Sequence, residues 1–264
     1  MIPGGAWLYI FSAVIGLIAG SFANVCIYRL PRGKSVIRPA SRCPSCQTPI
    51  KPWNNIPVLS YLMLRGRCRA CGQPISARYP AVECLNGLLY TIALYRFGPT
   101  ARTLFYFLFI TALIVITFID YDFQIIPDEI TLPGIPVGIL AGWLILPDPF
   151  YRALDMGMVA SLIGAATGFA LFYAIAFMSR GGMGGGDIKM MTMAGAVLGW
   201  EGVLLTTFTA SLLGSAIGIY LVIFKGKGRK WKIPFGPFLA AGALFSLFYG
   251  QEAVSWYLRY GRHW

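Results

Sequence analysis

The chain has 264 residues, of which 57% are hydrophobic and only 12% are charged, and its formal net charge is +12. A soluble domain normally carries about a quarter charged residues. The composition therefore excludes an ordinary soluble domain and predicts a polytopic membrane protein. The length allows roughly eight membrane spans of about 20 residues each, plus one modest polar domain.

The apolar segments predict an all-α fold with about eight transmembrane helices. The second expected span contains Glu83, and the sixth is short and carries Lys189. Polar or short spans are typical of helices that face protein or an aqueous cavity. The first apolar run has no basic start and is too long for a cleavable signal peptide, so we expect it to be retained. The expected spans lie near residues 7–28, 80–96, 102–119, 131–147, 156–178, 188–200, 202–224 and 235–257.

The basic residues predict the orientation in the membrane. With the N-terminus outside, one side of the membrane holds 17 of the 22 Lys and Arg residues and the other side holds five. Because basic loops stay in the cytoplasm, the loops at 29–79, 120–130, 179–187 and 225–234 are expected there. These patches also suit anionic lipid headgroups. Nucleic-acid binding is not expected, since no aromatic and basic recognition module is visible.

The loop 29–79 is the one domain-like insertion, and we expect no internal repeat in the chain. It holds two CxxC pairs, CPSC and CRAC, with 21 residues between them: Cys43, Cys46, Cys68 and Cys71. Two such turns can complete a tetrahedral zinc site, and four sulfur ligands make that site structural. A redox pair and coincidence remain the alternatives. Cys26 and Cys84 lie in expected spans and are interpreted as small buried residues.

Acidic residues are rare, and the positions of two of them suggest a catalytic site. Asp120 closes the third expected span and Asp187 opens the sixth, so both lie at the cytoplasmic face. Two carboxylates that meet in a low-dielectric site share a proton and can activate a water. Two separate interfacial acids are the alternative. Asp128 is expected to cap a helix, and Glu83 is expected to pair with Arg78, one turn away.

The stretch SRGGMGGGDIKMMTMAG, residues 179–195, places five glycines before Asp187. Neither a Walker loop nor a GxGxxG frame fits it, and a carboxylate in such a cradle would repel phosphate. We therefore expect Gly184, Gly185 and Gly186 to give the loop its flexibility. The only histidine, His263, lies at the tail, which excludes Ser-His and His-metal sites.

Seven motifs in order resemble the bifunctional type IV prepilin peptidases, also called prepilin leader peptidase/N-methyltransferases. The GGGD motif matches the GxGD signature of intramembrane aspartyl proteases. One difference is Phe123, where the family often has a histidine. The motifs are GSFANVCIYRLP (20–31), the paired CxxC turns, NNIPVLSYL (54–62), RYPAVE (78–83), IDYDFQIIPDEIT (119–131), GGGD (184–187) and IPFGPFLA (233–240).

The resemblance implies that Asp120 and Asp187 are the catalytic pair of an aspartyl endopeptidase. The enzyme would cleave the short basic leader of prepilins or pseudopilins after a glycine, at the cytoplasmic face of the bacterial inner membrane. It would also methylate the new N-terminal residue with S-adenosylmethionine. Zn²⁺ on the four cysteines would serve mainly the methylation. Gly66, in the RGRC run, is a candidate for the methyl-donor site.

These expectations give three domains. They are the first span at 1–28, a cytoplasmic zinc-binding and methyltransferase-associated loop at 29–79, and a transmembrane peptidase domain at 80–264. A proton-coupled transporter is the alternative function, since intramembrane acids can carry protons. That alternative explains neither the cysteine loop nor the ordered motifs.

Overall fold

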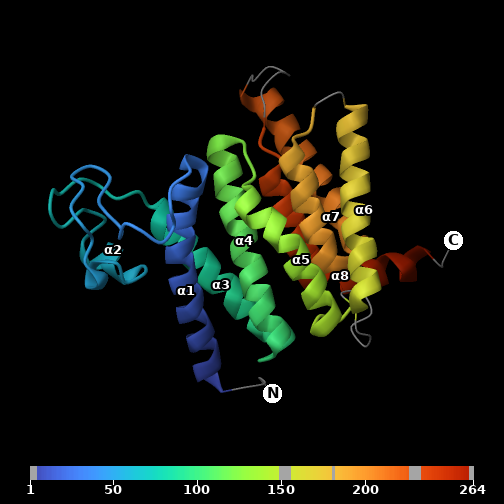
Figure 1. Ribbon diagram of the computed structural model, residues 1–264, viewed down its shortest axis with the longest axis horizontal. Coiled ribbons are helices and arrows are strands. Elements are labelled where there is room, and N and C mark those ends of the chain that lie inside the picture. The colour runs from blue at the N-terminus through green and yellow to red at the C-terminus, as the bar shows by residue number, and fades with distance from the viewer. Residues whose placement is uncertain (1–4, 149–155, 180–181, 226–232, 262–264) are drawn as a thin grey trace. The chain divides into compact units, whose positions relative to one another are not determined.

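The structure, a computed structural model, describes residues 5–148, 156–179, 182–225 and 233–261 (Figure 1). The regular elements within these ranges are helices, with no extended strand; isolated β-bridges join Arg42 to Pro49 and Arg67 to Pro74 in the loop 29–79. The elements are α1 (Ala6–Arg29), η1 (Leu30–Arg32), η2 (Pro52–Asn54), α2 (Leu59–Met63), α3 (Arg78–Phe97), α4 (Ala101–Phe123), α5 (Asp128–Leu144), α6 (Gly157–Met178), α7 (Gly185–Lys225) and α8 (Gly236–Gly261).

Each predicted span coincides with a helical segment, which confirms the all-α fold class. The sixth and seventh predicted spans form one element, α7, which is kinked at Gly199 (φ 71°, ψ 177°). Four helical segments in the described ranges are long and apolar enough to cross a membrane: Ala6–Arg32, Ala101–Phe123, Gly157–Met178 and Gly185–Phe224. The protein is therefore polytopic, and the number of eight spans remains a prediction.

The chain forms two compact units, Met1–Val115 and Ile116–Trp264. In the first unit α1 and α3 pack closely because small residues line their contact. A Cβ atom at Gly16 would lie 2.6 Å from the Cα of Gly87, and one at Gly20 would lie 2.6 Å from the Cα of Glu83. Such small-residue seams are typical of membrane helix pairs. The division at residues 1–28, 29–79 and 80–264 remains a prediction.

The second unit is a bundle in which α5, α6, α7 and α8 lie side by side (Figure 1). Helix α7 is central and contacts the other three. Its contacts depend on small residues again: a Cβ at Gly164 of α6 would overlap the backbone of α7 at Gly195 and Gly199. Helix α5 contains Pro133 and Pro136. Prolines inside a helix are tolerated in membrane proteins because neighbouring groups satisfy the freed backbone.

Candidate aspartate and cysteine sites

Asp120 lies in the last turn of α4, within the second unit, and its side chain is buried. Its Oδ2 atom accepts a hydrogen bond of 2.8 Å from the backbone N–H of Gly236, the first residue of α8. The first N–H groups of a helix have no partner within the helix, so they suit a carboxylate. Sequence reasoning missed this contact, although the motif IPFGPFLA already contained Gly236.

Asp187 lies in the first turn of α7. Its Oδ2 atom accepts a hydrogen bond of 3.3 Å from the N–H of Gly184, and its own N–H donates to the carbonyl of Gly184 over 3.2 Å. The first bond is one half of a helix capping box, in which an acid in the third helical position reaches back to the N–H of the cap residue; Gly184 has no side chain to supply the other half. The GGGD motif therefore folds as the beginning of a helix with its carboxylate held at the N-terminus.

The three glycines before Asp187 have different environments. Gly184 precedes α7, whereas Gly185 and Gly186 are its first residues. A Cβ at Gly186 would lie 2.8 Å from the Cβ of Ile126, so this glycine lets the loop between α4 and α5 approach α7. A Cβ at Gly185 would meet open space. The flexibility expected of these three glycines remains a prediction.

Asp120 and Asp187 belong to the second unit and lie near enough for their charges to interact. Each carboxylate is also held by one backbone N–H group, from Gly236 and Gly184 respectively. Two neighbouring carboxylates in a poorly solvated site hold one proton between them. Such a pair can polarise a water with its charged member and donate a proton from its neutral member.

Asp128 does not cap α5, so that expectation is wrong. The cap position is Pro127, and no side chain caps the helix. Instead both carboxylate oxygens of Asp128 accept hydrogen bonds of 2.7 Å from the ammonium of Lys189, two residues beyond Asp187 on α7. The long basic side chain of Lys189 can reach across the helix ends, whereas sequence spacing alone favoured a local cap.

The four cysteines of the loop lie together in the first unit. The sulfur atoms of Cys43, Cys46, Cys68 and Cys71 all lie within 4.8 Å of one another. Those of Cys43 and Cys71 are 3.9 Å apart. Tetrahedral Zn²⁺ with bonds of about 2.3 Å separates its sulfur ligands by about 3.8 Å. The cluster therefore fits a four-sulfur metal site with no open position, and all four predicted ligands belong to it.

The two cysteine turns are a structural repeat. Both follow the pattern Arg-Cys-x-x-Cys-x-x-Pro-Ile, over residues 42–50 and 67–75. In each turn the first cysteine's N–H donates to the carbonyl five residues later, over 3.1 Å to Thr48 and 2.8 Å to Gln73. The expectation of no internal repeat is therefore wrong for this loop. The repeat is nine residues long, too short to stand out in a search for repeated domains.

Local hydrogen bonds lower the pKa of two of the four thiols, whereas desolvation and the neighbouring thiols raise the pKa of Cys71 to about 11. The hydroxyl of Thr48 lowers the pKa of the Cys46 thiol to about 6. Backbone N–H groups of Cys71 and Ala70 lower the pKa of Cys68 below its ordinary value. Since the thiolate is the form that binds a metal, these bonds favour the ligand state of Cys46 and Cys68.

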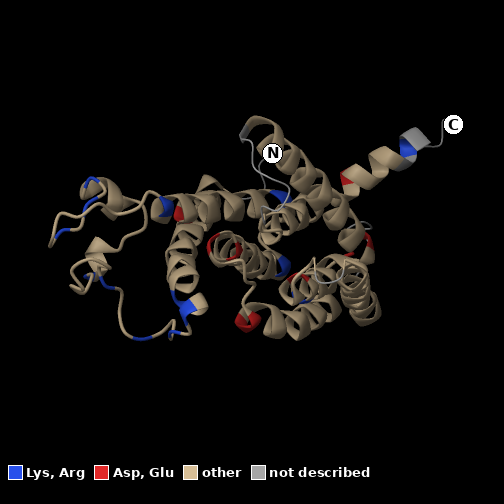
Figure 2. Ribbon diagram, turned by 90° about the horizontal axis from the view of Figure 1, so that it is seen from above, with Lys and Arg blue, Asp and Glu red and all other residues tan. Residues whose placement is uncertain are grey.

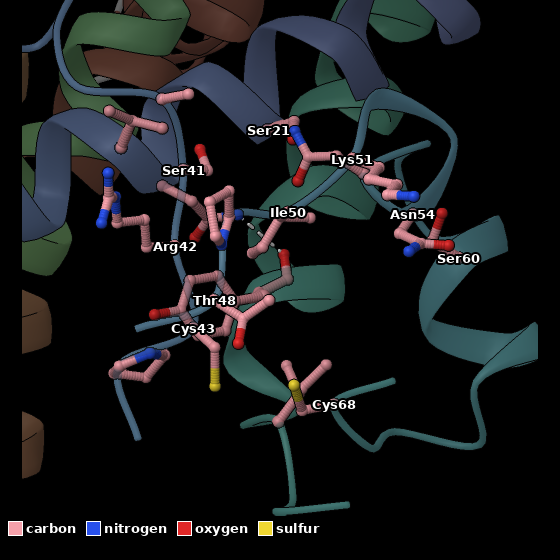
Figure 3. A pocket seen from close by; sticks show the side chains of 18 of the residues that line it. Ser21, Ser41, Arg42, Cys43, Thr48, Ile50, Lys51, Asn54, Ser60 and Cys68 are labelled. Carbon is pink, nitrogen blue, oxygen red and sulfur yellow. Dashed lines mark hydrogen bonds between the residues drawn. The ribbon is translucent and has the colours of Figure 1, made fainter. Parts of the chain in front are cut away.

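A cavity of about 880 Å³ in the first unit reaches from the cysteine cluster to α1 and α3 (Figure 3). Figure 3 shows Cys43 and Cys68 at one end of it and Ser21 of α1 at the other. Gly66 does not line this cavity. It has a left-handed backbone (φ +67°), and a Cβ there would lie 2.9 Å from the hydroxyl oxygen of Tyr61, so turn geometry accounts for this glycine.

Glu83 does not pair with Arg78, so that expectation is wrong. Its carboxylate accepts a 2.8 Å hydrogen bond from the N–H of Val58 and another from the hydroxyl of Ser21. Val58 has φ +60°, which is unusual for a β-branched residue. Glu83 therefore anchors the NNIPVLSYL segment to α3, a contact over 25 residues that one-turn spacing could not predict.

Comparison with known proteins identifies the family. Residues 14–97 match the model of the bacterial peptidase A24 N-terminal domain, and residues 107–219 match that of the type IV leader peptidase family. The chain is 36% identical to a prepilin leader peptidase/N-methyltransferase of Legionella pneumophila, over 96% of each chain. It is also 36% identical to the Bacillus subtilis protein of that name, over 93% of this chain and 96% of the relative.

No match was found among solved structures. The relatives nevertheless cover nearly the whole chain, and the two family domains follow each other in the order of the two structural units. The chain therefore belongs to the type IV leader peptidase family.

Proposed function

We propose that this enzyme removes the leader peptide from type IV prepilins or pseudopilins and then methylates the new N-terminal residue. The observation that supports the proposal is that Asp120, in the last turn of α4, and Asp187, in the first turn of α7, lie near enough for their charges to interact, in a chain of this family. The names of the relatives support both activities. The alternative of a proton-coupled transporter receives no support from them.

In the proposed cleavage the two aspartates share one proton. The charged member takes a proton from a water, whose oxygen attacks the scissile carbonyl. The neutral member protonates the departing amine as the C–N bond breaks. The N–H of Gly236 fixes Asp120, while Asp187 sits beside the glycines of GGGD, which let a peptide backbone approach closely.

The four cysteines are proposed to hold Zn²⁺. Bound Zn²⁺ would serve as a structural crosslink between the two cysteine turns. S-adenosylmethionine is the proposed methyl donor, and its methyl group would be supplied to the amine of the cleaved chain. The Arg and Lys residues of the surrounding loop, visible in Figure 2, offset the negative charge of four thiolates.

The proposed location is the bacterial inner membrane, with both sites facing the cytoplasm. The excess of basic residues in the loop 29–79 and near Lys225–Lys232 supports this orientation. The apolar part of a prepilin would lie among the spans, and its basic leader would remain in the cytoplasm. Membrane lipids are therefore expected partners, and nucleic acid is not.

The test is to incubate membranes that contain the enzyme with a prepilin and S-adenosylmethionine. We expect a shortened product whose new N-terminal residue gains the mass of one methyl group. An uncut prepilin would contradict the peptidase assignment. A shortened but unmethylated product would mean that the enzyme has lost the second activity.

A further inference from the structure

The first unit contains a buried carboxylate with no cationic partner. Glu83 is 8% exposed and lies in the wall of the cavity. It accepts hydrogen bonds from the N–H of Val58 and the hydroxyl of Ser21, and no Lys or Arg in the described part of the chain pairs with it. An unpaired buried charge is costly, so its presence here needs an explanation.

Hydrogen bonding alone does not explain the charge. The carbonyl oxygen of a glutamine could accept both hydrogen bonds. Glu83 is the only carboxylate among residues 1–119, a region with ten basic residues between Arg29 and Arg78. A negative charge at this one position is therefore a specific feature of the cavity wall, and it suits a cationic ligand.

Several of the basic side chains that line the cavity contact groups other than Glu83. Arg29 donates to the carbonyls of Ser35 and Pro39, and Arg69 donates to Asn54. The ammonium of Lys51 lies 5.4 Å from the ring centre of Trp53. None of the basic side chains that line the cavity pairs with Glu83, so its carboxylate is available to a cation that enters from outside.

We propose that Glu83 binds the primary amine of the newly exposed N-terminal residue, so that this end of the cavity is the acceptor subsite for methyl transfer. The proposal rests on the proposed function. A terminal ammonium would form a charge-assisted hydrogen bond to the carboxylate, which is stronger than a neutral one. The cavity, at about 880 Å³, also has room for a second molecule of ordinary cofactor size.

The proposed subsite also prepares the amine for reaction. Glu83 accepts one proton from the ammonium, which leaves a neutral amine with a free lone pair. The amine then forms a new N–C bond while the C–S bond of a sulfonium methyl donor breaks, and the donor leaves as a thioether. The methylated amine keeps the positive charge, and Glu83 releases its proton to water.

The test measures equilibrium binding in the absence of any methyl donor. Two fluorescent apolar peptides with the sequence of a mature pilin N-terminus are compared, one with a free amine and one with an acetylated amine. The full-length wild-type protein in detergent should bind the free amine at least about tenfold more tightly, because a charge-assisted hydrogen bond to a buried carboxylate is lost on acetylation. Equal affinity of the wild-type protein for both peptides would overturn the proposal without any variant.

The variant Glu83→Gln keeps both hydrogen-bond acceptor roles and removes the charge. It should bind the two peptides within about twofold of each other, and Glu83→Asp should restore part of the preference. The control is Glu252→Gln, at an exposed carboxylate of α8, which should keep the full preference. A full preference in Glu83→Gln would overturn the proposal, since the charge would then have no role in binding the amine.

Methylation kinetics of the free-amine peptide distinguish a failure of the Glu83 subsite from an absence of methyltransferase activity. The KM for the peptide should rise at least about tenfold in Glu83→Gln, while the KM for S-adenosylmethionine changes less than about twofold. A rise confined to the KM for the donor would overturn the acceptor assignment. Absence of methylation by the wild-type protein would count against the proposed function itself, whereas the binding comparison would still report on Glu83.

Discussion

The cysteine cluster and the aspartate pair hold their reactive side chains in different ways. Each cysteine turn is closed by hydrogen bonds within about ten residues, such as the bond of 2.8 Å from the N–H of Ile50 to the carbonyl of Ser41. The aspartate pair depends on distant parts of the chain: Asp120 is held by Gly236, 116 residues later. A site built from local turns can stay in place when neighbouring helices shift, whereas the aspartate pair requires the whole second unit to be assembled.

The largest effect is expected from the aspartates themselves. Asp120→Asn and Asp187→Asn keep the shape of the side chains but remove the shared proton, so prepilin cleavage should fall by about 10³-fold or more. The measurement is the initial rate of leader removal from a purified prepilin. Asp122→Asn is the matched control, because Asp122 is exposed and only two residues away, and it should stay within about threefold of wild type. Substantial cleavage by either Asn variant would show that Asp120 and Asp187 are not the catalytic pair.

Substitution of one cysteine of the cluster should lower the zinc content of the protein. Cys43→Ser removes one of four ligands and should weaken zinc binding at least about 100-fold, since an apparent binding free energy of roughly 10–16 kcal/mol is shared by four ligands. Metal analysis of the purified protein should find less zinc, and methylation should fall more than cleavage. Cys26→Ser is the control, because Cys26 lies in α1 outside the cluster. A Cys43→Ser protein with a full zinc complement would contradict the four-cysteine site.

Gly236→Ala tests the long-range support of the aspartate pair. A Cβ at this position would lie 2.7 Å from the Oδ2 atom of Asp120, so the carboxylate would have to move away from its N–H donor. Cleavage should fall about tenfold to 100-fold, which corresponds to a lost hydrogen bond to a charged group. The control is Gly214→Ala, where the nearest atom would be 3.5 Å away. Wild-type cleavage by Gly236→Ala would mean that Asp120 does not need this N–H group.

The same contrast explains what the sequence could predict. The helices, the cysteine ligands and the two aspartates follow from apolar run length, CxxC spacing and the ordered family motifs. The contacts of Gly236, Lys189 and Glu83 do not, because each joins residues that only helix packing brings together. Asp128 and Glu83 were assigned to local partners for the same reason: helix-turn spacing offers nearby candidates and contains no information on distant ones.

The smallest effect is expected from the ion pair that joins α5 and α7 near the aspartates. Lys189 and Asp128 are 2.7 Å apart, but their side chains are 38% and 51% exposed, so solvent screens much of their attraction. Exposed pairs contribute about 1 kcal/mol or less. Lys189→Met should therefore reduce cleavage only about twofold to fivefold, if the pair helps to hold the first turn of α7 beside the loop between α4 and α5.

A double-mutant cycle with Asp128→Asn separates this role from a general effect of charge. If the pair acts as a unit, the double variant should cleave at nearly the rate of the slower single variant. The loss of cleavage rate relative to wild type should also be smaller in high salt, because salt screens the ion pair. Multiplication of the two single effects would show that Lys189 and Asp128 act independently. The support of Asp187 would then depend on Gly184 and on the packing of Gly186 against Ile126, that is, on neighbouring backbone rather than on charge.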